Sequence, residues 1–184
     1  LKASVHKNGK IYVQEYKQGK EQYLVKEGGS TDLRGTEVIF YPDPEIFESL
    51  EYHYEILSTR MRELSYLNKG LIINMSDERE SSKDEEGNYP KERFFSEKGL
   101  SEFVEFLDSN RERLIQKVIS VEGEKSGIPV EVALVYNNSY AENIHSYVNN
   151  INTHEGGTHL SGFRRGLTNT LKKYADKSGM LDKL

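Results

Sequence analysis

The clearest pattern of hydrophobic and polar positions lies between residues 158 and 175. Apolar side chains recur there at steps of three and four residues, at Leu160, Phe163, Leu167, Leu171 and Tyr174. This spacing places them along one side of an α-helix. Gly156-Gly157 comes just before the pattern and predicts a break in regular structure, with Thr158 as the expected N-cap.

Helical spacing also occurs in two earlier segments. Residues 54–67 carry Leu57, Met61, Leu64 and Leu67 on one face, and Asn68-Lys69-Gly70 is a suitable C-terminal stop. A second helix is expected from about Lys98, where apolar residues recur through Leu107. Pro44 favours a short helix ending near Glu48, with Asp43 as its cap.

Strands are predicted where apolar and polar positions alternate. Asn8-Gly9 is a strong type I′ turn signal, so a hairpin is expected to pair Ala3 and Val5 with Ile11 and Val13. Further strands are expected at residues 37–41, 71–75, 92–95, 118–124, 128–136 and 144–148, with 71–75 buried. The charged stretch 76–91 shows no periodicity and predicts a loop. This mixture of helices and antiparallel hairpins indicates an α+β fold.

Composition restricts the function classes. The 184 residues carry a net charge of −5 and include no cysteine, which excludes disulfides and thiolate metal sites. No apolar run approaches the ~20 residues that span a bilayer, and the first residues show no signal-peptide pattern, so a cytoplasmic protein without membrane contact is expected. An acidic chain does not bind nucleic acid over its whole surface, and any such contact must be local.

Residues 158–175 reverse the sign of the charge. They contain no acid, and Arg165, Lys172 and Lys173 lie away from the apolar side, with Arg164 at its edge. A solvated helix face is the ordinary interpretation of such residues. However, solvated faces usually interleave acids with bases at i,i+4, and none is present here. The pattern therefore favours a surface that contacts phosphates.

Several segments resemble the B subunit of bacterial DNA gyrase, a type IIA topoisomerase. Residues 154–175 (HEGGTHLSGFRRGLTNTLKKYA) match its transducer signature, an E-G-G-T-H turn that opens a G-F-R helix. Residues 54–70 (YEILSTRMRELSYLNKG) are similar to its R-x-R-E-L-x-F-L-N-x-G helix. Residues 35–47 are similar to the strand that closes its ATPase domain, and residues 127–136 and 147–152 to its transducer sheet. The matches occur in the family's order along nearly the whole chain.

The resemblance implies a domain organisation. Residues 1–98 would be the C-terminal part of a GHKL ATPase sandwich, and residues 99–184 the N-terminal part of a transducer domain with a ribosomal-protein-like fold. The family's catalytic glutamate, its Mg-binding asparagine and its D-x-G-x-G motif lie before Leu1, and its glutamine–lysine loop lies after Leu184. No catalytic residue is therefore expected in this chain, and the chain alone is expected to be inactive.

The same resemblance assigns candidate site residues. Thr36 would lie at the floor of the ATP pocket and reach the adenine through water, and Val38 would touch the adenine. Lys7 stands where the family often has an arginine at the pocket rim, and a lysine lacks the planar guanidinium for stacking. On their chemistry alone, all three residues would be considered structural. Arg164, Arg165, Lys172 and Lys173 would face DNA held between two B subunits.

The function implied is that of an ATP- and Mg²⁺-dependent topoisomerase. The full subunit would dimerise on ATP binding, act with the gyrase A subunit that cleaves DNA, and couple hydrolysis to passage and supercoiling of a DNA segment. The B subunit of topoisomerase IV is an alternative, since it shares most of these motifs. A non-enzymatic nucleic-acid-binding module of ribosomal-protein type is a further alternative, although it leaves the 35–47 strand unexplained.

A metal site is not expected. His154, Glu155 and His159 invite a zinc hypothesis, but the two histidines are five residues apart across Gly-Gly, whereas metal-binding helices use i,i+4. The acidic residues around Asp84 lack the spacing of a calcium-binding loop.

Overall fold

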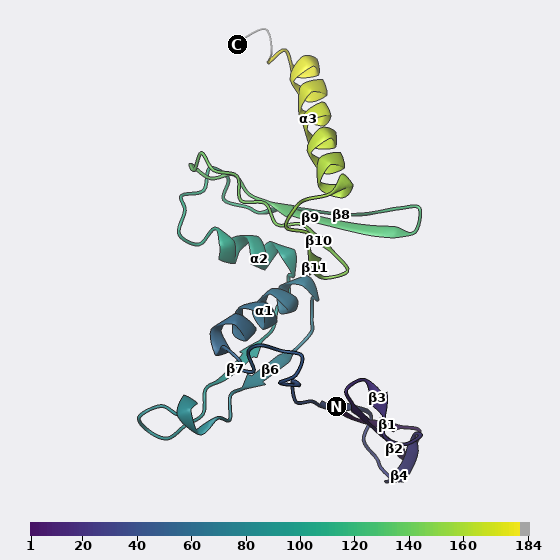
Figure 1. The fold of residues 1–184 in the computed structure, drawn as a ribbon. Helices are drawn as coiled ribbons and strands as arrows, with labels where there is room; N and C mark the ends of the chain where they lie inside the picture. The colour runs from purple at the N-terminus through teal and green to yellow at the C-terminus, as the bar shows by residue number, and fades with distance from the viewer. Residues whose placement is uncertain (181–184) are drawn as a thin grey trace. The chain divides into compact units, whose positions relative to one another are not determined.

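The structure is a computed structural model that describes residues 1–180 (Figure 1). The chain divides into two compact units, Leu1–His53 and Tyr54–Leu184. Among the described residues, every strand pair is antiparallel and the helices are separate from the strands in the sequence. The expected α+β class is therefore confirmed. The domain boundary expected between residues 98 and 99 falls inside the second unit and remains a prediction.

The first unit is an antiparallel sheet. Its strands are β1 (Lys2–Lys7), β2 (Lys10–Lys17), β3 (Lys20–Glu21), β4 (Lys26–Ser30) and β5 (Gly35–Ile39). β1 lies between β2 and β5, and the other edge of β2 pairs with both β3 and β4. β5 is the strand expected at residues 37–41, and it begins two residues earlier.

Two-residue turns with left-handed backbone set the register of four hairpins. Both residues have positive φ in Asn8-Gly9, Gln18-Gly19, Ser126-Gly127 and Asn149-Asn150. This geometry is that of type I′ turns, whose twist matches that of the flanking strands. The expected Asn-Gly hairpin is confirmed, but the expected pairing of Ala3 and Val5 with Ile11 and Val13 is wrong. A two-residue turn at Asn8-Gly9 places Lys7 opposite Lys10 and Val5 opposite Tyr12, so Ile11 and Val13 lie opposite His6 and Ser4 on the other face.

The prediction of a short helix at residues 44–48 is wrong. The segment forms a single turn, in which the Glu45 N–H donates to Asp43 Oδ1 at 2.9 Å and the Phe47 N–H donates to the Asp43 carbonyl at 2.9 Å. Asp43 therefore caps the turn as expected. A single turn fixes the backbone of several residues but gains few hydrogen bonds, so it does not extend into a helix.

The second unit contains the three α-helices and three two-stranded hairpins of the described residues (Figure 1). Its elements in chain order are α1 (Tyr54–Leu67), β6 (Ile73–Ser76), the 3₁₀ turn η1 (Glu80–Ser82), β7 (Lys91–Phe94), α2 (Leu100–Leu107), β8 (Ile119–Lys125), β9 (Ile128–Leu134), β10 (Tyr147–Val148), β11 (Ile151–Asn152) and α3 (Thr158–Ser178). The hairpins pair β6 with β7, β8 with β9 and β10 with β11.

The core of the second unit is centred on α1 and α2. α1 packs on α2, β6 and β7, and α2 packs on β8 and β9. Phe94 and Phe103 are buried, and the Tyr66 ring stacks on Phe103 with 5.1 Å between centroids. Ser65 is also buried and donates to the Arg62 carbonyl at 2.7 Å, so its hydroxyl does not remain unsatisfied.

Two strands of the second unit differ from the expectation in burial or in length. The strand expected at 71–75 is β6 at Ile73–Ser76, and the expectation that it is buried is wrong, because its residues alternate between half-buried and exposed. Leu71 and Ile72 before it are 45% and 48% exposed. The strand expected at 144–148 shrinks to the two residues of β10, since the hairpin pairs only Tyr147 and Val148 with the two residues of β11. The Asn149-Asn150 turn ends β10 where the strand was expected to end. Asn-Asn is a weaker turn signal than Asn-Gly, which explains why the hairpin was not predicted.

α3 is one uninterrupted helix of 21 residues (Figure 1). Its N-cap is Gly157 rather than the expected Thr158, and no side chain caps it. Gly179, in the left-handed conformation, ends the helix. Leu160, Phe163 and Leu167 are half-buried, whereas the later apolar positions are exposed. No helix within residues 1–180 has the length and apolar character to cross a membrane.

Candidate functional sites

The three candidate nucleotide-contacting residues lie on one face of the first unit's sheet. Thr36 pairs with Val5, and Val38 pairs with Ala3. Directly opposed residues share a face, and so do residues two apart on a strand, so Lys7 lies on this face with Thr36 and Val38. Since β5 is an edge strand, Thr36 and Val38 are accessible, and Val38 is 54% exposed.

Thr36, Val38 and Lys7 together bring a hydroxyl, an apolar side chain and a cation to this strand face. Lys10 and Glu27 lie on the same face across β2 and β4, where their side chains form an ion pair at 2.9 Å. Tyr12, opposite Val5, belongs to the same face and was missed by the sequence analysis. The Asn8-Gly9 turn fixes its register, so the position could have been read from that turn.

The basic residues of α3 form a surface opposite its apolar stripe. Arg165 and Lys172 are seven residues apart, nearly two full turns, so they project from the same side about 10 Å apart along the axis. Lys173 and Arg164 flank them, and all four residues are exposed. Within residues 1–180, no hydrogen bond or ion pair involves the side chains of Arg165, Lys172 and Lys173.

Arg164 differs from the other three because it is paired. Its Nη2 atom lies 2.7 Å from Glu142 Oε2, and the two side chains are 52% and 72% exposed. Glu142 comes from the segment before β10, 22 residues earlier, so no helical periodicity could have predicted the pair. An exposed pair of this kind contributes little stability, and an anion with more charge can displace the carboxylate.

The turn before α3 requires a glycine at position 156, which has φ +80°, a conformation that other residues rarely adopt. A Cβ on Gly157 would stand 2.7 Å from the His159 ring, so the ring would have to rotate away. The His159 Nε2 atom lies 3.3 Å from Thr153 Oγ1. The residues that the structure describes contain no group of three His, Asp or Glu side chains arranged for a metal ion.

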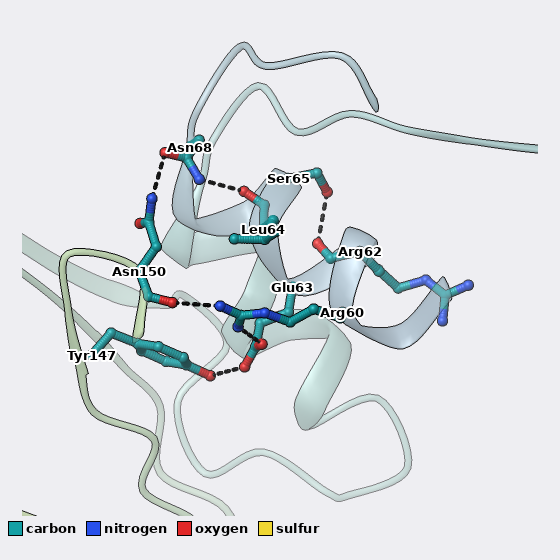
Figure 2. A network of polar contacts seen from close by, with 8 residues as sticks. All are labelled: Arg60, Arg62, Glu63, Leu64, Ser65, Asn68, Tyr147 and Asn150. Atoms are coloured by element: carbon teal, nitrogen blue, oxygen red, sulfur yellow. Dashed lines mark hydrogen bonds and ion pairs between the residues drawn. The ribbon is translucent and has the colours of Figure 1, made fainter. Parts of the chain in front are cut away.

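A network of polar contacts joins α1 to the β10–β11 hairpin (Figure 2). Glu63 accepts hydrogen bonds from Arg60 and from the Tyr147 hydroxyl. Arg60 Nη2 also donates to the Asn150 carbonyl at 2.7 Å, and Asn150 Nδ2 donates to Asn68 Oδ1 at 3.0 Å. Burial of the Tyr147 hydroxyl, and then its bond to Glu63, raises the pKa of Tyr147 well above its ordinary value. No local sequence pattern predicts this network, because it joins residues more than 80 positions apart.

Comparisons with known proteins identify close relatives. A family profile described as DNA gyrase B matches residues 99–184. The DNA gyrase B subunits of Cytophaga aurantiaca and Cytophaga hutchinsonii are each 58% identical over 184 residues, which is 100% of this chain and 38% of theirs. The DNA gyrase B subunit of Halalkalibacterium halodurans is 44% identical over 181 residues, 98% of this chain and 27% of its own. The chain thus spans 38% of the length of the Cytophaga relatives.

Solved structures give the same result for the fold. The 43K ATPase domain of Thermus thermophilus gyrase B, crystallised with an aminocoumarin, superposes with a TM-score of 0.78 at 29% identity, over 97% of this chain and 47% of that one. The B subunit of the DNA gyrase from Myxococcus xanthus superposes with a TM-score of 0.77 at 21% identity, over 95% of this chain and 50% of that one, and supports the fold.

Proposed function

The chain belongs to the DNA gyrase B family, and we propose from this membership that it forms the segment of a gyrase B subunit that links ATP hydrolysis to DNA handling. The observation that carries the proposal is the 58% identity over all 184 residues. The complete subunit would act as an ATP-dependent type IIA topoisomerase in the cytoplasm. It would bind ATP with Mg²⁺, dimerise through the B subunit, and work with the gyrase A subunit on DNA.

We place the domain boundary between residues 98 and 99. Residues 1–98 would complete an ATPase domain of GHKL type, and residues 99–184 would begin the transducer. Support comes from the family profile, whose match begins at Gly99, directly before α2. Gly99 has φ +60° and its Cβ position lies 3.3 Å from the Tyr66 carbonyl, so a larger residue would be strained at this junction.

Within the nucleotide site, this chain would supply the adenine end. Thr36 and Val38 fit the floor of a pocket for a flat base, because one offers a hydroxyl and the other an apolar contact on the same strand face. Lys7 would lie at the rim. These residues include no Mg²⁺ ligand and no general base, so the chemistry of hydrolysis would come from elsewhere in the subunit. Residues 1–184 alone are therefore expected to be inactive as an ATPase.

The basic side of α3 would hold the DNA segment. Strand passage must accept any sequence, and contacts from lysine and arginine to phosphates carry no sequence information. Arg165, Lys172 and Lys173 have no partner among the described residues that would have to be displaced, and Arg164 would exchange Glu142 for a phosphate. A local cationic surface on a chain of net charge −5 restricts DNA to this helix.

A supercoiling assay tests the proposed function. The complete subunit that contains this chain, mixed with its cleavage partner, should introduce negative supercoils into relaxed plasmid only when ATP and Mg²⁺ are present. ATP-dependent relaxation and decatenation without supercoiling would instead indicate topoisomerase IV. The absence of any ATP-dependent change in DNA topology would refute the enzymatic proposal.

A further inference from the structure

The β10–β11 hairpin is held against α1 by its first strand and by its turn. Tyr147 in β10 donates to Glu63, and Arg60 reaches the carbonyl of Asn150 in the turn (Figure 2). Asn150 also donates to Asn68, just after the C-terminal end of α1. These contacts involve the middle and the end of α1, so they fix the direction of the hairpin as well as its position.

The contact to Glu63 is protected from water. The Glu63 side chain is only 19% exposed, and Arg60 lies beside it. The Tyr147 ring lies 6.4 Å from the buried ring of Phe103, centroid to centroid. A hydrogen bond to a charged acceptor is stronger in such surroundings than at the surface. Tyr147 therefore anchors the hairpin through its ring and through its hydroxyl.

The other end of the hairpin holds the start of α3. The Thr153 N–H donates to the Ser146 carbonyl at 2.8 Å, and the two hydroxyl oxygens are 2.6 Å apart. Thr153 then contacts His159 through its hydroxyl, and its carbonyl accepts from the Gly156 N–H at 2.8 Å. Hydrogen bonds thus connect α1 to the first turn of α3 without a break.

We propose that Glu63, Tyr147 and Asn150 are positioning residues that set the orientation of α3, and so of its basic side, relative to α1. The inference rests on the proposed function, because it assumes that α3 contacts DNA. Because α3 is held at its first turn, a rotation there displaces residues near its C-terminal end by the largest distance. Lys172 is 14 residues beyond Thr158, about 20 Å along the axis, so a small rotation at the hairpin moves the lysine by several ångströms.

Tyr147→Phe in the complete subunit, assayed with its cleavage partner, is the direct test. The substitution removes the hydroxyl and keeps the ring on Phe103. Basal ATPase activity should stay unchanged, while stimulation of the ATPase by DNA should fall about twofold to tenfold, the range that corresponds to the ~0.5–1.5 kcal/mol of a typical hydrogen bond. Glu63→Gln should give the same loss, and the double variant should lose no more than either single variant.

Tyr140→Phe is the matched control, since the Tyr140 side chain is fully exposed and makes no hydrogen bond within the described residues. It should leave both activities unchanged. Loss of DNA stimulation in this variant equal to that in Tyr147→Phe would overturn the proposal.

A distance measurement separates positioning from general stability. The chain has no cysteine, so spin labels can be attached at Glu55→Cys in α1 and Asn169→Cys in α3 once any cysteines elsewhere in the subunit are replaced. The distribution of label distances should broaden in Tyr147→Phe and stay narrow in Tyr140→Phe. An unchanged distribution, or equal losses of basal and DNA-stimulated ATPase, would overturn the proposal. Normal DNA stimulation in Arg164→Gln would instead count against the proposed DNA contact itself.

Discussion

Glu142 is an acid that reduces the cationic character of α3 at Arg164, and Asp176, four residues after Lys172 in the helix, is a second acid near the basic residues. The Glu142 carboxylate lies 2.7 Å from Arg164, and both side chains are exposed, so the proposed contact of Arg164 with a phosphate would displace Glu142. Glu142→Gln should therefore strengthen duplex binding by the complete subunit by up to about fivefold, since exposed ion pairs contribute ~0.2–1 kcal/mol. The comparison is made by titration with labelled duplex at several salt concentrations.

Glu155→Gln controls for the change in net charge, because Glu155 is exposed and makes no side-chain contact within residues 1–180. An equal gain of affinity in both variants would show that only the overall charge matters. The Glu142→Gln gain should also disappear when Arg164 is already Gln.

Asp108 differs from the exposed Glu142, because the Asp108 side chain is buried and only 5% exposed. It accepts from Arg113 Nε at 3.1 Å and from Asn137 Nδ2 at 2.5 Å. Asp108→Ala would leave both donors without their acceptor and should destabilise this region by about 2–3 kcal/mol. Arg113→Gln should also destabilise it, because a buried carboxylate would lose its charged partner.

Hydrogen exchange measures this effect locally. The Leu114 and Asn138 amides donate to the carbonyls of Tyr136 and Glu112 beside the Asp108 site, so both should exchange faster in Asp108→Ala. Amides in β1 and β2 serve as the internal reference. Unchanged exchange at Leu114 and Asn138 would show that Asp108 does not stabilise this part of the chain.

At the level of elements, the sequence predicts those helices and hairpins whose bounds are set by residues within the same segment. The bounds of α1 are those expected, because four apolar positions and the Asn68-Lys69-Gly70 stop act within one segment. The β1–β2 and β8–β9 hairpins follow from local turn residues. The burial expected for the 71–75 strand was wrong, because an apolar run does not reveal which neighbours will bury it.

The sequence predicts only part of the candidate sites, as it predicts only part of the fold. Periodicity alone indicates the basic side of α3, whereas the strand face with Thr36 and Val38 came from the family resemblance. The Arg164–Glu142 pair and the Tyr147–Glu63 bond could not be predicted, because they join positions 22 and 84 residues apart that meet only after folding.

The loop between β6 and β7 should respond to acid. Asp77 accepts from Arg79 and from Ser82 Oγ at 2.6 Å, and these two contacts lower the pKa of Asp77 below its ordinary value. Because the pKa of Asp77 is lowered in the folded loop, ionised Asp77 stabilises the loop fully at pH values above about 4, the ordinary pKa of an aspartate. This stabilisation is lost as the pH falls through the lowered pKa. The loop should therefore keep its contacts at pH 5, and NMR titration of the Asp77 carboxyl should give a midpoint clearly below that of a free aspartate.

Proteolysis provides a second measurement for the same loop. Asp77→Asn should increase the rate of cleavage between residues 78 and 90, because the neutral side chain holds Arg79 less firmly. Glu85→Gln is the matched control, since Glu85 makes no side-chain contact within the described residues. Equal cleavage rates in the two variants would contradict the role of Asp77.

At the scale of the whole molecule, the candidate functions occupy different units. The strand face proposed to contact the nucleotide lies in Leu1–His53, and the helix proposed to contact DNA lies near the end of Tyr54–Leu184. Substitutions in α3 should therefore act on DNA-dependent steps and leave nucleotide chemistry intact. The two kinds of step should therefore respond separately to substitution in the complete subunit with its cleavage partner.

The most direct measurement compares basal and DNA-stimulated ATPase in the triple variant Arg164→Gln, Arg165→Gln and Lys172→Gln. Basal turnover should be nearly unchanged, DNA stimulation should be largely lost, and the log–log salt dependence of duplex binding should flatten by about 2 to 3, or ~0.9 per phosphate contact. Lys125→Gln, at the β8–β9 turn, should change neither. Equal losses of basal and DNA-stimulated turnover, or an unchanged salt dependence, would contradict the assignment of α3 to DNA.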